Sequence, residues 1–290
     1  MNLEQDENSP VKAPNPLLAR LNKLPGTTIR LPSRGLFYHN GELDAECIEG
    51  EVNVFPMTTT DELMMRSPDM LFQGTAIESV IKRCIPQIKK PLELLVGDID
   101  YILTQLRRVS YGSHIPVNYD CDCAKTTEEK SKRKQSGDNE YLIPVEHFIQ
   151  NTKELSVKDF NKQFKVQLAN GQKVILQPLR FSDFIKIQQM QDPEAMKNVE
   201  NVKEFVATNF ASVTQSVDEI DDKELIKEWY RELPRLETEK IKKKLDNMDD
   251  WGIEFKYTIK CKYCKEDKVL TTQLNPVYFF MLPSSPETQS

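Results

Sequence analysis

Glycine and histidine are scarce in this chain, and their scarcity argues against several kinds of active site. The 290 residues include ten glycines and three histidines. No segment has the glycine-rich pattern that binds a phosphate group, and His39, His114 and His147 lie in separate segments without an HExxH arrangement. Ser110 and Ser113 precede His114 closely, but the GxSxG motif of a nucleophilic serine is missing from the sequence. We therefore assign no catalytic residue and expect a protein that is not an enzyme.

Long apolar runs and an excess of basic charge are lacking as well. No apolar run approaches the roughly 18 residues that a membrane-spanning helix needs. The formal net charge is −6, whereas a general nucleic-acid-binding protein has a basic surface. With 39% hydrophobic and 29% charged residues, the composition is that of an ordinary globular protein. We expect neither a membrane span nor a small-molecule substrate, and nucleic acid is a disfavoured partner.

Cysteine is where the sequence does carry chemistry, because four of the six cysteines form two close pairs. Cys121 and Cys123 follow a short strand-like run, and Cys261 and Cys264 end the run 257–260 as in the knuckle of a zinc ribbon. The pairs are separated by 137 residues. Paired thiolates of this kind bind one tetrahedral ion, so we predict a shared site formed by these four cysteines.

Two disulfides or four unrelated thiols are the alternatives to a metal site. The first residues do not resemble a secretory signal, so we expect reduced thiols and disfavour disulfides. One structural zinc is favoured over an iron–sulfur cluster. A closed set of four cysteines leaves no position for water or substrate, which indicates a structural role for the metal. Cys47 and Cys84 stand alone in apolar surroundings and are expected to be small core residues.

The hydrophobic pattern predicts an α+β fold in which a small β domain is clipped by the cysteines. Residues 76–84 and 98–109 have apolar positions at helical spacing, and Asn170-Gly171 lies between two alternating runs, as in a hairpin. The polar stretch 124–139 is expected to be a loop. The predicted parts are an extended arm (1–30), a β element with a helical subdomain (31–115), the first half of the β domain (116–180), an inserted helical subdomain (181–247) and the second half of the β domain (248–290).

Tyr278, Phe279 and Phe280 begin an apolar run near the end of the chain. Such a run fills the core of the β domain in one interpretation, and it is a docking surface in the other. On the second interpretation the three aromatic residues are candidate partner-binding residues.

Several segments of the chain carry a resemblance to a known family. They are, in order, Gly35-Leu36-Phe37-Tyr38, Val54-Phe55-Pro56-Met57, Thr60-Asp61-Glu62 with Ser67-Pro68-Asp69, Val80-Ile81-Lys82-Arg83-Cys84, and residues 106–112. Together with the knuckle and the aromatic residues 278–280, they resemble the baseplate hub proteins and hub assembly proteins of T-even-type contractile-tailed bacteriophages. The resemblance extends over roughly residues 30–283 in the order of elements.

This resemblance implies a non-enzymatic structural or assembly component of the hub of a phage tail baseplate. Its partners would be other hub proteins, and its location the virion tail baseplate or an assembly intermediate made in the host bacterial cytoplasm. The alternative is a zinc-ribbon-type nucleic-acid-binding regulator, because Lys260, Lys262, Lys265 and Lys268 surround the second cysteine pair.

Overall fold

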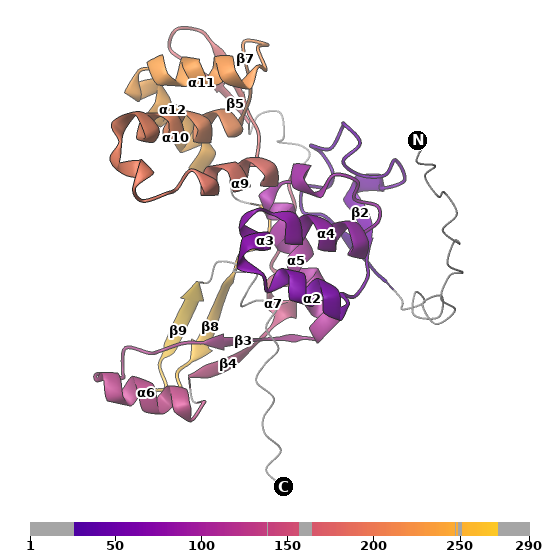
Figure 1. Ribbon diagram of the computed structural model, residues 1–290, viewed down its shortest axis with the longest axis vertical. Coiled ribbons are helices and arrows are strands. Elements are labelled where there is room, and N and C mark those ends of the chain that lie inside the picture. The colour runs from indigo at the N-terminus through magenta and orange to yellow at the C-terminus, as the bar shows by residue number, and fades with distance from the viewer. Residues whose placement is uncertain (1–25, 138, 157–163, 247, 249–250, 272–290) are drawn as a thin grey trace, which may run out of the picture.

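The chain folds into a helical core, a second lobe and a projecting arm (Figure 1). A computed structural model describes residues 26–137, 139–156, 164–246, 248 and 251–271. Helices are combined with small antiparallel sheets, so the predicted α+β class is confirmed. The expected extended arm of residues 1–30 lies outside the described residues except at its end, where β1 (Thr27–Arg30) pairs with β2 (Glu51–Val54).

The helical core is built from short helices whose starts are specified locally. These helices are α2 (Thr59–Met65), α3 (Pro68–Phe72), α4 (Thr75–Cys84), α5 (Val96–Tyr111) and α7 (Val145–Gln150), with 3-10 turns η1 (Ile48–Gly50) and η2 (Pro91–Glu93). Thr58 and Asp61 form a capping box at the start of α2, and Pro68 occupies the first turn of α3. Helices α4 and α5 bury the apolar faces that their spacing predicts, including Cys84. Cys47 is half-buried against the same cluster.

A buried carboxylate attaches the loop after β1 to the first turn of α5. Asp98 is fully buried and accepts hydrogen bonds from the backbone N–H of Ser33, at 3.0 Å, and from the hydroxyl of Tyr38, at 2.5 Å. The backbone N–H of Leu95 in turn donates to the Tyr38 hydroxyl. Burial raises the pKa of Asp98 to about 6, although the bonds from Ser33 and Tyr38 act in the opposite direction.

The second lobe surrounds a three-stranded antiparallel sheet with the order β5–β6–β7. Its elements are β5 (Lys165–Gln167), β6 (Lys173–Leu176), η3 (Ala195–Lys197), α10 (Val199–Ser212), β7 (Thr214–Val217), α11 (Lys223–Glu232) and α12 (Arg235–Asp246). The Asn170-Gly171 hairpin between β5 and β6 is confirmed, with Gly171 at a φ of +91°. Val174, Ile226 and Ile241 are almost fully buried in a hydrophobic cluster of this lobe.

The second lobe leaves and rejoins the rest of the chain at adjacent backbones. Lys153 and Gly252 exchange two backbone hydrogen bonds, at 3.0 and 2.8 Å. Helix α9 (Phe181–Gln189) packs on the helical core, and Arg180 before it donates to the carbonyl oxygens of Glu93 and Phe37. The junction therefore has its own hydrogen bonds in addition to apolar contacts.

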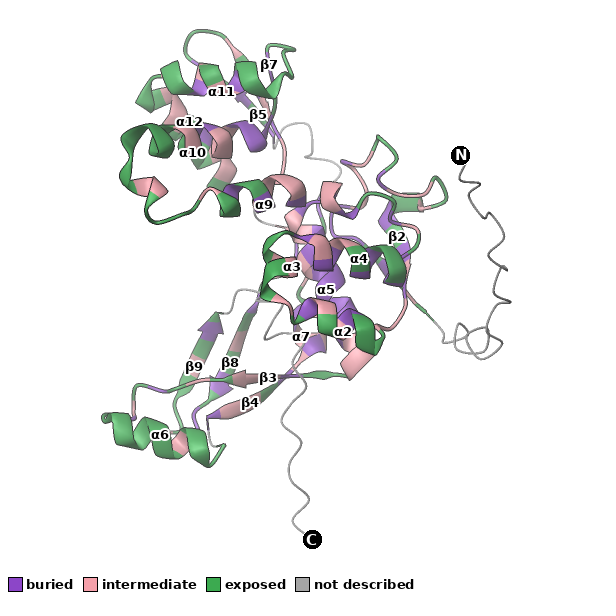
Figure 2. Cartoon of the chain, in the orientation of Figure 1, coloured by how far each residue is buried: buried purple, intermediate pink, exposed green. Residues whose placement is uncertain are grey.

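The arm consists of two antiparallel pairs of strands, which cross each other, and a short helix. Its elements are β3 (His114–Asn118), α6 (Thr127–Gln135), β4 (Glu140–Pro144), β8 (Lys256–Lys260) and β9 (Asp267–Thr271), and β3 pairs with β4 as β8 pairs with β9. Ile115, Ile143 and Ile259 join the arm to the hydrophobic cluster of the helical core. Buried positions are dense in that core, whereas α6 at the tip of the arm is almost entirely exposed (Figure 2).

Candidate metal centre

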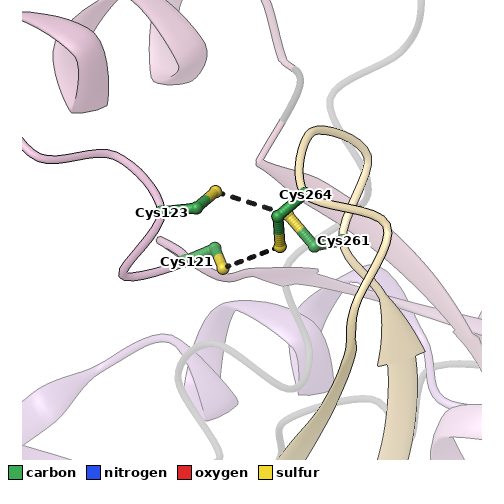
Figure 3. Close-up of side chains that lie close together, drawn as sticks. All are labelled: Cys121, Cys123, Cys261 and Cys264. Carbon is green, nitrogen blue, oxygen red and sulfur yellow. Dashed lines mark hydrogen bonds between the residues drawn. The ribbon is translucent and has the colours of Figure 1, made fainter.

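The four paired cysteines meet at the arm, as the sequence predicts. Their sulfur atoms all lie within 4.8 Å of one another. The Sγ atoms of Cys121 and Cys264 are 3.9 Å apart, and those of Cys123 and Cys261 are 3.7 Å apart (Figure 3). Among the residues that the structure describes, no other group of three or more cysteine, histidine or acidic side chains has ligand atoms arranged to hold an ion.

Each cysteine pair lies where a strand ends in a turn. Cys121 and Cys123 follow β3, whereas Cys261 and Cys264 occupy the turn between β8 and β9. The backbone N–H of Cys261 donates to the carbonyl of Glu266, which closes this turn above the last strand pair. Lys265 in the turn has a φ of +61°, a conformation that glycine adopts more readily. The turn geometry brings both sulfurs of the knuckle to one side.

The sulfur separations fit one tetrahedral ion and not a disulfide. A disulfide has sulfur atoms about 2.05 Å apart, and all six cysteines of the chain are free thiols. Four thiolates at the zinc–sulfur distance of about 2.3 Å lie about 3.8 Å from one another in a regular tetrahedron. Two of the separations, 3.7 and 3.9 Å, agree with this value, and the others are at most 4.8 Å. The donor set is therefore suited to zinc or to another ion that prefers tetrahedral sulfur ligands.

Backbone N–H groups supply part of the environment that thiolates require. Although burial acts to raise the pKa of Cys261, hydrogen bonds from the backbone N–H of Tyr263 and Cys264 lower it to about 6. These donors come from the knuckle itself. Cys121 and Cys261 are buried, whereas Cys123 and Cys264 are partly exposed. The centre thus combines a shielded inner half with an outer half at the surface.

Sequence reasoning missed a helix that contacts the outer half of the centre. The stretch 124–139 was expected to be a loop because of its polarity, and this expectation is wrong, since it contains α6. The signal was present in the sequence: Thr126 and Glu129 form a capping box, in which each side chain accepts a backbone N–H of the other residue. Arg133 of this helix donates to Cys123 Sγ at 3.1 Å, a bond that lowers the pKa of the Cys123 thiol.

The other residues singled out from the sequence do not join the centre. Tyr278, Phe279 and Phe280 lie outside the described residues. His147 packs against the ring of Tyr257 at the base of the arm, and His114 contacts the hydroxyl of its neighbour Ser113. In the lysine-rich knuckle, Lys268 pairs with Glu266 at 2.7 Å, so part of its positive charge is balanced locally.

Across the described ranges, none of the helices is both long and apolar enough to cross a bilayer.

Comparison with known proteins gives one result that covers most of the chain. A family model described as T4 bacteriophage base plate protein matches residues 42–281. No curated protein and no solved structure matches the chain. The matched range includes all four paired cysteines and both hairpins of the arm.

Proposed function

This chain belongs to the T4 bacteriophage base plate protein family, and we propose that it acts as a structural or assembly component of the baseplate hub. Membership of the family makes it a structural protein of a phage tail baseplate, with other phage tail proteins as partners. The hub is the finer assignment, and it rests on the resemblance of residues 35–38, 54–57 and 106–112 to hub and hub assembly proteins. The match over residues 42–281 carries the family, and the resemblance of these segments is the observation that carries the hub assignment.

A non-enzymatic role agrees with the chemistry of the centre. Four cysteines around one ion would occupy all positions of a tetrahedron, so no position would be open to water or substrate. When bound, the ion would supply crosslinks between the turn after β3 and the turn after β8. The cysteines themselves would hold these turns together and fix the direction of the arm. We assign the metal-binding role to Cys121, Cys123, Cys261 and Cys264, with one zinc per chain.

The metal assignment is tested by elemental analysis of the untagged protein and of two variants. One zinc per chain is expected in the wild type and none in Cys121→Ser or Cys261→Ser, because each removes a ligand from a different turn. Cys47→Ser is the matched control, since Cys47 is a free thiol outside the centre, and it should keep its zinc. A wild type without metal contradicts the assignment. A visible absorption spectrum typical of an iron centre would show that the bound metal is iron and not zinc.

The hub assignment is tested by locating the protein during phage tail assembly. Hub subassemblies and complete baseplates purified from infected cells should be analysed by quantitative mass spectrometry. We expect the chain in the hub fraction, either retained in the particle or lost after assembly. Its absence from hub fractions and its presence in peripheral baseplate parts would contradict the hub assignment while leaving the family intact.

A further inference from the structure

Helix α6 has too little apolar surface to hold its place on the arm. Its nine residues, Thr127–Gln135, are all polar and none is buried. Every residue of the helix is exposed except Arg133. A helix of this length is marginal in water without tertiary contacts, and a helix that is polar all round gains nothing from a hydrophobic core. Its position must therefore depend on a few specific polar contacts.

Arg133 provides such contacts, and both lead to the cysteine centre. Its Nη1 atom donates to Cys123 Sγ at 3.1 Å. The same guanidinium lies 3.7 Å from the centroid of the Tyr263 ring, within stacking distance. Cys123 belongs to the first cysteine pair, whereas Tyr263 lies between the two cysteines of the second pair. One side chain thus connects α6 to both cysteine pairs of the centre.

The contact between Arg133 and the cysteine centre depends on the ion in two ways, through the charge of the centre and through the crosslink between its two turns. Four thiolates around a divalent cation carry a net charge of −2, and part of this charge faces the surface at Cys123. A guanidinium that donates to a ligand sulfur offsets the charge and orients that ligand, as partners of metal ligands do in other sites. Without the ion, the two turns are not crosslinked, and the surfaces that Arg133 joins are free to separate.

We propose that Arg133 is a positioning residue of the metal centre and that metal binding holds α6 on the arm. This inference rests on the proposed metal centre. It makes α6 a metal-dependent element: its exposed lysines, Lys130, Lys132 and Lys134, have a fixed orientation only when the ion is bound. Any partner that contacts this face would then recognise the metal-loaded chain.

The test compares Arg133→Gln with Lys132→Gln in the full-length protein. Both variants remove one positive charge from α6, but Lys132 is exposed and Arg133 contacts the centre. Two quantities are measured: zinc affinity by competition with a chromophoric chelator, and amide hydrogen exchange of residues 127–135 with and without zinc. The affinity reports on the ligands, and the exchange reports on the helix.

For Arg133→Gln we expect zinc binding weakened about 10-fold to 100-fold, the range typical of lost partners of metal ligands. We also expect fast exchange in α6 even with zinc bound. Lys132→Gln should match the wild type, in which removal of zinc abolishes the protection of α6. Unchanged zinc affinity in Arg133→Gln, or equal protection of α6 with and without zinc, would overturn the inference and leave the metal centre standing. A wild type that binds no zinc overturns both.

Discussion

The helical core and the arm of this protein are held together in different ways. In the helical core, α4 and α5 bury whole apolar faces, and side chains such as Ile81 and Ile102 are fully enclosed. The arm is made of paired strands with only a few buried positions, and four sulfur atoms lie within 4.8 Å of one another at its tip. Two-stranded sheets are marginal by themselves in water. The comparison teaches that a thicker region relies on apolar burial, whereas a slender projection has little of it and would gain most from a crosslink such as the proposed metal ion.

The difference in exposure also suggests a division of roles. A buried core resists local opening, whereas an arm with exposed strands and an exposed helix opens at lower free energy unless it is crosslinked. The arm is also the part that projects from the body of the molecule (Figure 1). If the two regions are as independent as their packing indicates, a substitution in one of them should leave the stability of the other unchanged.

The largest expected effect is the loss of order at the tip of the arm in Cys261→Ser. Structural zinc in small peptides contributes on the order of 10 kcal/mol of folding free energy, so removal of one ligand should abolish the protection of β8 and β9 against hydrogen exchange. Helix α5 should keep its protection, because its contacts are apolar and distant from the sulfurs. Equal loss of protection in α5 would show that the two regions are one cooperative unit.

The converse substitution is Ile102→Ala in the middle of α5. Ile102 is fully buried, and removal of a buried isoleucine side chain costs about 2–5 kcal/mol through lost transfer energy and a cavity. We expect a lower denaturation midpoint at unchanged zinc content. Leu142→Ala is the control on the arm: this leucine is 60% exposed, so its truncation should change the free energy of unfolding little. Zinc loss in Ile102→Ala would show that the arm is not independent of the helical core.

A smaller effect is expected from the buried carboxylate of Asp98. Its pKa is raised to about 6 in the folded chain, from an ordinary 3.8, so between these values the folded chain binds more protons than the unfolded chain. Stability therefore falls as the pH rises through this window. Relative to Asp98→Asn, the wild type should lose about 2 kcal/mol of unfolding free energy between pH 4.5 and pH 7.

The measurement is chemical denaturation of both proteins at the two pH values. Asp100, whose pKa burial raises to about 7, is present in both proteins, and its contribution cancels in the difference. Parallel pH profiles for wild type and variant would contradict the assignment of this dependence to Asp98. Zinc-free protein should show the same difference, since Asp98 lies in the helical core.

The smallest effect is expected in the knuckle. Lys265→Gly replaces a side chain at a φ of +61° by the residue that tolerates this conformation, so we expect a gain of about 0.5–1 kcal/mol in unfolding free energy. Lys265→Ala keeps a Cβ atom and should give no gain. Differential scanning calorimetry of the zinc-loaded proteins measures both. A loss of stability in the glycine variant would show that the hydrogen bond from Lys265 Nζ to the Lys262 carbonyl outweighs the backbone strain.

The sequence predicts the elements that depend on local signals. The apolar spacing of α4 and α5 and the Asn170-Gly171 hairpin are confirmed. Strand β7 is not foreseen, because Thr214–Val217 is short and mostly polar and pairs with β6, from which α9 and α10 separate it in the sequence. Such a pairing depends on contacts between distant residues, which single-sequence patterns do not contain.

The candidate site shows the same division between local and distant information. The spacing within each cysteine pair is local information, because a pair needs only a turn to present two sulfurs. The meeting of the two pairs is predicted because one tetrahedral ion takes four such ligands. The role of Arg133 is not visible in the sequence, since nothing local distinguishes this residue from the lysines on either side of it. Only the placement of α6 against Tyr263 separates Arg133 from its neighbours.

The paired backbones of Lys153 and Gly252 have a consequence for how this chain can change over evolution. The strands and helices of the second lobe all lie between these two residues, and the chain returns to the helical core between them at α9. Each doubling of the length of a flexible loop adds only about 0.6 kcal/mol to the free energy that closing the loop costs. Insertions and deletions in the loops of the second lobe itself should therefore be tolerated without displacing the cysteines. Homologous chains are expected to vary most in length between these two positions and least between each cysteine and its adjacent strand.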